Sequence, residues 1–74
     1  MDERYAVIGE SEGYPVLYHM NQTRRIAEQL RKRREALLSR PCFIVPMAAW
    51  LTDPLRALRR AEATRLQEPG TSAL

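Results

Sequence analysis

The stretch YAVIGESEGYPVLYH at residues 5–19 decides the fold, because two runs of apolar and aromatic residues flank a short polar segment. Runs of this composition favour β-strands. The segment ESEG at residues 10–13 suits a type I turn in which Gly13 takes the left-handed conformation. The sequence therefore predicts a β-hairpin at the start of the chain.

This turn also predicts a register for the hairpin. Ile8 is expected opposite Val16 on one face, and Tyr5 opposite His19 on the other. Both faces are partly apolar, so one must pack on a helix and the other is either covered as well or exposed. Pro15 cannot donate a ladder hydrogen bond, which places the second strand at an edge of the sheet.

A long amphipathic helix is predicted to follow the hairpin. Asn21 is a suitable N-cap, and no Gly or Pro interrupts the chain from there to Ser39. Helical spacing gathers an apolar stripe wide enough to cover one sheet face, formed by Ile26, Ala27, Leu30, Leu37 and Leu38. Pro41 disfavours a helical conformation at the residue before it and so ends the helix.

The rest of the chain predicts one more strand and one more helix. The apolar run 42–45 reads as a buried third strand closed by Pro46, and Thr52-Asp53-Pro54 is a strong helix start. The second helix is only weakly amphipathic. The expected fold is a single α+β domain over residues 1–67, with a three-stranded sheet in the order 2-1-3, a helix packed on one face and a flexible tail over residues 68–74.

Composition limits the classes of protein that the chain can belong to. Twelve basic residues against nine acidic ones give a net charge of +3, and residues 24–40 alone hold seven of the basic residues. A surface polarised in this way attracts an oppositely charged partner. The single cysteine excludes an internal disulfide, and Met1 is followed by no apolar leader. These features predict a soluble protein of the cytoplasm.

The sequence argues against an enzyme and against a bound metal. His19 and Cys42 are the only histidine and the only cysteine, too few for a zinc site and without an obvious third group for nucleophilic catalysis. The acidic residues of the turn are expected to be solvated, and the three glycines are isolated, so no phosphate-binding loop is present. We expect no cofactor, and a protein that acts by binding.

Seven residues are candidates for contact with a partner. Two arginine pairs lie on the predicted helices, and Trp and Tyr are common anchors of protein interfaces. The alternative for Arg34 is a purely structural role, in which the stem of its side chain packs along the core while its guanidinium reaches water. The alternative for the aromatic residues is also structural, namely packing in the core. The candidates are Arg33, Arg34, Arg59, Arg60, Trp50, Tyr14 and Tyr18.

The hairpin at residues 5–18, the arginine-rich helix at residues 23–39 and the strand at residues 42–45 together resemble small phage-encoded host-takeover proteins. That resemblance implies a non-enzymatic module that docks on a host machine such as bacterial RNA polymerase and modulates transcription, in the host cell cytoplasm. An inhibitor of a CRISPR complex fits the same likeness. Apart from the resemblance, the arginine-rich helices leave a nucleic-acid-binding protein open, and the hairpin edge leaves a homo-oligomer open.

Overall fold

The computed structural model describes residues 3–66, which form three strands and three helices. The predicted tail at residues 68–74 lies outside the described residues. In chain order the elements are β1 (Tyr5–Ser11), β2 (Tyr14–Gln22), α1 (Arg24–Leu38), β3 (Phe43–Pro46), α2 (Met47–Thr52) and α3 (Pro54–Leu66).

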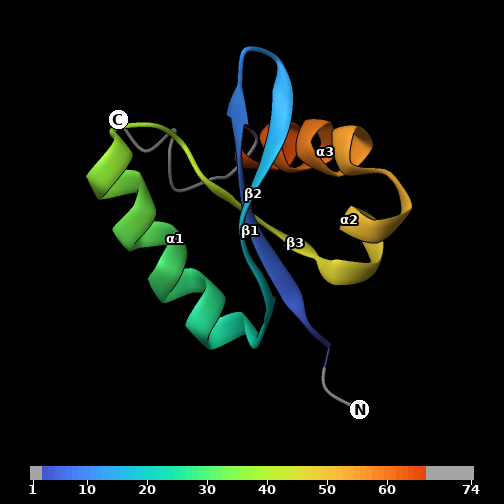
Figure 1. Cartoon of the computed structure of the whole chain (residues 1–74), viewed down its shortest axis with the longest axis horizontal. Coiled ribbons are helices and arrows are strands. Elements are labelled where there is room, and N and C mark those ends of the chain that lie inside the picture. The colour runs from blue at the N-terminus through green and yellow to red at the C-terminus, as the bar shows by residue number, and fades with distance from the viewer. Residues whose placement is uncertain (1–2, 67–74) are drawn as a thin grey trace.

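The sheet has the order β2-β1-β3, with β1 antiparallel to both neighbours. This confirms the predicted strand order and the predicted position of β2 at an edge. Figure 1 shows three layers, with α1 on one side of the sheet and α2 and α3 on the other. The chain is therefore an α+β domain in which both faces of a small sheet are covered.

The central strand β1 is buried on both faces. Ala6, Val7 and Ile8 have no solvent-exposed surface. Val7 packs toward α1 in a core cluster with Ala27 and Cys42. Ala6 and Ile8 belong to a second cluster, to which α2 and α3 contribute Met47, Ala57 and Leu58. The apolar character of both hairpin faces is explained by these two cores.

The hairpin turn is tighter than the sequence predicted. β1 continues to Ser11, which pairs with Tyr14, and only Glu12 and Gly13 form the turn. Both have positive φ, 53° and 85°, the property of a two-residue type I′ turn whose twist matches that of the strands. Ile8 consequently lies opposite Leu17, and the predicted pairing with Val16 is wrong by one residue.

β2 is longer than the strand it pairs with, at nine residues against seven. The pairing shifts on both sides of Val7, so that Val7 lies opposite His19 and Tyr5 lies opposite Gln22 instead of His19. The extra residues form bulges, which leave part of an edge strand without regular pairing. Asn21, the predicted helix cap, lies in this irregular stretch with a φ of 58°.

Local hydrogen bonds and backbone conformations determine where the helices begin and end. Thr23, not Asn21, caps α1, since its hydroxyl accepts the N–H of Ile26 at 3.3 Å. The helix ends at Ser39, which is in the left-handed conformation. For α3 the prediction is confirmed, because Asp53 accepts the N–H of Arg56 at 3.2 Å and Pro54 opens the helix. The short helix α2 was not predicted.

Gly9 is required by the ring of Tyr18, which packs against it across the hairpin. A Cβ at residue 9 would lie 2.7 Å from Tyr18 Cε2. We expect Gly9→Ala to lower the free energy of unfolding by about 1–3 kcal/mol through overpacking, measured by urea denaturation. In a Tyr18→Ala background the same substitution should cost much less. An equal cost in both backgrounds would show that the ring is not the reason for the glycine.

Candidate protein-binding groove

The second edge of the sheet is β3, and the backbone N–H and C=O of its residue Ile44 point away from the sheet. Met47 N donates to Arg4 O at 2.9 Å, just beyond the pair Tyr5–Pro46. Hydrogen-bonded and non-bonded pairs alternate along an antiparallel ladder. The N–H and C=O of Ile44, opposite Val7, therefore face outward, whereas the C=O of Pro46 lies at the N-cap of α2 and accepts from that helix.

This edge is the floor of an open groove with a volume of about 820 Å³ between α1 and α3. All four β3 residues line it, together with side chains of both helices. On the α1 side these are Arg24, Glu28 and Arg31, which follow at intervals of four and three residues and so share one helix face. The groove wall on this side is one continuous polar stripe.

α3 supplies the opposite wall. Arg60, Thr64 and Arg65 line the groove, with Ala57 and Ala61 at its base. The small alanine side chains let α3 pack closely on the sheet, since Ala57 is buried and Ala61 packs against the same core cluster. The arginines are thereby left at the rim, above a mainly apolar floor.

One end of the groove is closed by a side-chain clasp formed by Glu35 and Arg65. The N–H of Cys42 donates to Glu35 Oε2 at 2.9 Å, and Arg65 Nη1 donates to the carbonyl oxygen of Cys42 at 2.8 Å. Glu35 also forms ion pairs with Arg65 and, at 3.2 Å, with Arg31. The clasp satisfies the two backbone groups that precede those of Ile44 along the open edge.

The pKa of Glu35 reflects this clasp. Burial alone would raise the pKa, but the hydrogen bonds from Arg65 and the Cys42 N–H, with the charges of Arg65 and Arg31, lower it below its ordinary value. The carboxylate is therefore ionised at neutral pH and holds both arginines in place.

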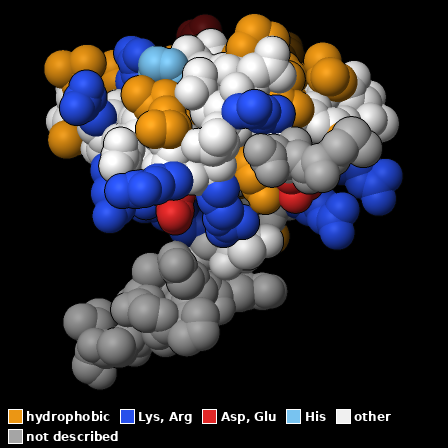
Figure 2. All heavy atoms as spheres, turned by 90° about the horizontal axis from the view of Figure 1, so that it is seen from below, with side chains coloured by type: hydrophobic (Ala, Val, Ile, Leu, Met, Phe, Trp, Pro, Cys, Tyr) orange, Lys and Arg blue, Asp and Glu red, His pale blue; other side chains and the backbone are white. Residues whose placement is uncertain are grey.

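The electrostatic character of the groove is positive. Four arginines line it against one acidic residue, Glu28. Arg31 and Arg65 are partly neutralised by Glu35, while among residues 3–66 neither Arg24 nor Arg60 has a carboxylate within ion-pair distance. The guanidinium of Arg24 lies 5.6 Å from the centre of the Tyr5 ring, which restrains it near the groove. Figure 2 shows one face of the molecule, on which Lys and Arg side chains far outnumber acidic ones.

Of the residues predicted to bind a partner, only Arg60 lines this groove. Arg33 and Arg59 are exposed on their helices but lie outside it. Trp50 lies in α2, where it is half-buried and packs against the core cluster that includes residues of α3. Tyr14 is exposed beside the hairpin turn. Sequence reasoning missed Arg24, Arg31 and Arg65, although the spacing of residues 24, 28 and 31 was a usable signal.

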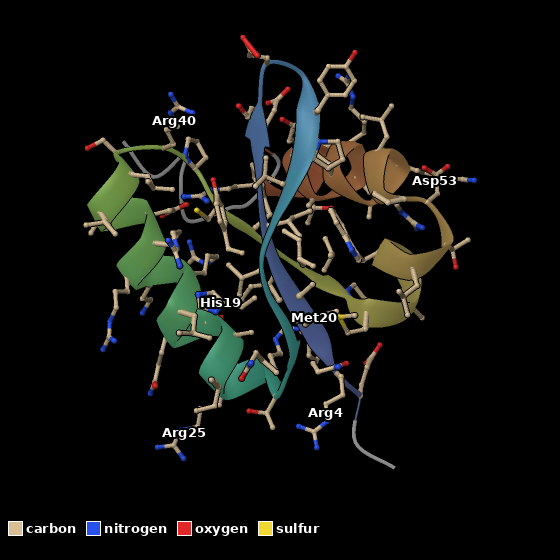
Figure 3. All side chains as sticks on the ribbon, in the orientation of Figure 1. Arg4, His19, Met20, Arg25, Arg40 and Asp53 are labelled. Carbon is tan, nitrogen blue, oxygen red and sulfur yellow. The ribbon has the colours of Figure 1, made fainter. Side chains whose placement is uncertain are left out.

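Arg34 and Tyr18 form a separate cluster on the α1 face of the sheet. The guanidinium of Arg34 lies 5.0 Å from the centre of the Tyr18 ring, and its Nη2 is 3.3 Å from His19 Nε2. Figure 3 shows His19 between the sheet and α1, while Arg25 on the same helix points away from the sheet. Both Tyr18 and His19 contact Arg34 because the bulge in β2 turns successive side chains to one face. The cluster attaches α1 to the sheet.

The geometry brings no catalytic set together among the described residues. His19 lies in β2 and Cys42 directly precedes β3, and β1 separates these two strands. Burial raises the pKa of the Cys42 thiol, so it is less nucleophilic at neutral pH than an exposed thiol. Within residues 3–66, no three His, Cys, Asp or Glu side chains are grouped as ligands for a metal ion. None of the helices in this range has the length and hydropathy needed to cross a bilayer.

A second, smaller hollow lies beside the hairpin turn and is acidic. Glu10 and Glu62 face each other there, with Arg40 on its rim. Burial and the neighbouring Glu10 carboxyl raise the pKa of Glu62, while Arg59 partly offsets them. The sequence had suggested that Glu10 is simply solvated. The Glu10–Glu62 contact shows instead that the hairpin end packs near α3, with two like charges close together.

Comparison with known proteins gives no relative for this chain. No family model, no curated protein and no solved structure matches it.

Proposed function

We propose that the chain is a non-enzymatic protein-interaction module and that the groove over β3 is its binding face. The observation that supports this most directly is the outward-facing backbone of Ile44 at the floor of a groove lined by arginines. An open strand edge is a template for another chain, and the surrounding positive charge favours an acidic one. The partner segment is therefore extended and acidic.

The proposal is tested with a labelled acidic peptide of sequence TVEEVT, its lysine counterpart TVKKVT and a DNA duplex, using fluorescence anisotropy. The acidic peptide should bind and the basic one should not. Preference for the duplex, with an affinity that falls steeply as salt rises, would instead identify a nucleic-acid-binding protein.

Charge reversal in the groove is expected to remove binding. Arg24→Glu with Arg60→Glu should weaken binding of the acidic peptide by about tenfold or more, because about 1.4 kcal/mol of lost attraction gives that factor. The control, Arg33→Glu with Arg56→Glu, changes the net charge by the same amount on the same two helices but outside the groove. Equal losses in both variants would mean that overall charge, not the groove, determines binding.

The partner itself is proposed to be a larger host assembly, with bacterial RNA polymerase as the first candidate. The support is the resemblance in build described above. Purified RNA polymerase should bind the unmodified chain and the control variant, but not the groove variant, in a surface-based binding assay. If the unmodified chain does not bind RNA polymerase, that candidate is ruled out and a CRISPR complex becomes the next candidate partner.

A further inference from the structure

We infer that the partner segment joins the sheet as a fourth strand, paired with β3 at Ile44. This inference rests on the proposed function and specifies how the groove is used. The N–H and C=O of Ile44 face outward along the groove floor. An extended chain beside β3 can bond both, as when a peptide adds a strand to an open sheet edge.

The clasp at Cys42 sets the limit of this pairing. Glu35 accepts from the Cys42 N–H and Arg65 donates to the Cys42 carbonyl, the two bonds that a neighbouring strand would otherwise make. At the other end, Pro46 has no N–H to offer. Pairing is therefore confined to the few residues around Ile44, and the bound segment is short.

The walls of the groove determine the chemistry of that segment. Successive side chains of an added strand point to opposite faces of the sheet. One set would face Arg24 and Arg31 on α1, and the other would face Arg60 on α3. Both sets meet positive charge, so two adjacent acidic residues fit better than acidic residues at alternate positions only.

A second copy of this chain is a poor occupant of the same edge. Joining two β3 strands would bring the arginine-lined walls of both copies together, and like charges disfavour that arrangement. The occupant is therefore an acidic segment of a different protein.

The experiment follows amide hydrogen exchange while the TVEEVT peptide binds. Exchange at Ile44 should slow by about tenfold or more when the new bond forms, at saturating peptide. Val45, whose N–H faces β1, is the internal control and should change little. In parallel, single N-methylation along the peptide should weaken binding about tenfold at the one residue opposite Ile44 and much less elsewhere, because the C=O of Cys42 bonds Arg65 and the C=O of Pro46 caps α2, which leaves the C=O of Ile44 to accept a peptide N–H.

The possible results separate the two proposals. Loss of binding at one methylated position, with protection of Ile44, supports strand addition. Binding that is sensitive to Arg24→Glu with Arg60→Glu, but without protection of Ile44 and without one sensitive methylated position, overturns strand addition and leaves the groove as the binding face. Peptide binding that is absent, or unaffected by that charge reversal, overturns the proposed function itself.

Discussion

Replacement of Leu58 by alanine is expected to remove most of the stability of the fold. Leu58 has no exposed surface and lies in the core cluster between α3 and the sheet. Truncating a buried leucine to alanine typically costs about 2–5 kcal/mol, from lost transfer free energy and the cavity left behind. A single core in a chain this short supplies only about 3–5 kcal/mol of net stability. Circular dichroism during urea denaturation measures the loss.

Leu55→Ala is the matched control for this prediction. It is the same substitution in the same helix, but the Leu55 side chain is 43% exposed. The change in unfolding free energy should be less than about 1 kcal/mol, since surface substitutions are usually small in effect. Similar losses for the two variants would show that α3 is not held to the sheet through Leu58.

Glu35→Ala is expected to lower the free energy of unfolding by about 1–3 kcal/mol, because it removes the carboxylate that accepts from the Cys42 N–H and pairs with Arg65. The clasp joins three segments that are distant in the sequence, so its loss loosens α1, the start of β3 and the end of α3 together. Glu28→Ala, on an exposed part of α1, is the control and should change stability little. Thermal denaturation of both variants measures the difference.

The contribution of Glu35 should also depend on pH. Its pKa in the folded chain is below the ordinary value of 4.5. A group with a lowered folded pKa stabilises the protein above its unfolded pKa, and this stability is lost as the pH falls through the folded value. The difference in unfolding free energy between the unmodified chain and Glu35→Gln should be constant from neutral pH to about pH 5 and shrink below it. A difference that does not change down to pH 3 would contradict this assignment.

The sequence was sufficient to predict the three strands, the two longer helices and the order of the strands. Pro15 placed β2 at an edge, and Asp53-Pro54 located the start of α3, because these are local properties of the backbone. The register of the hairpin was not predictable in the same way. It depends on a two-residue turn at Glu12 and Gly13 and on bulges around Val7, which are favoured by packing on both faces of the sheet.

The groove was harder to predict than the fold. The sequence indicated Arg33 and Arg34 as binding residues because they belong to a dense run of charge. In the structure, Arg33 lies outside the groove and Arg34 packs on Tyr18. Arg24 and Arg60 are far apart in the sequence and share a site only because α1 and α3 lie on either side of β3. That arrangement follows from the tertiary packing of two helices on opposite faces of one sheet.

The bulges and Pro15 in β2 have a consequence for how many molecules can assemble. A sheet with two regular edges can accept chains on both sides and grow into a fibre. In this fold the β2 side is irregular, so growth can continue only from β3. A single added strand saturates the molecule, which favours discrete one-to-one complexes over open-ended polymers.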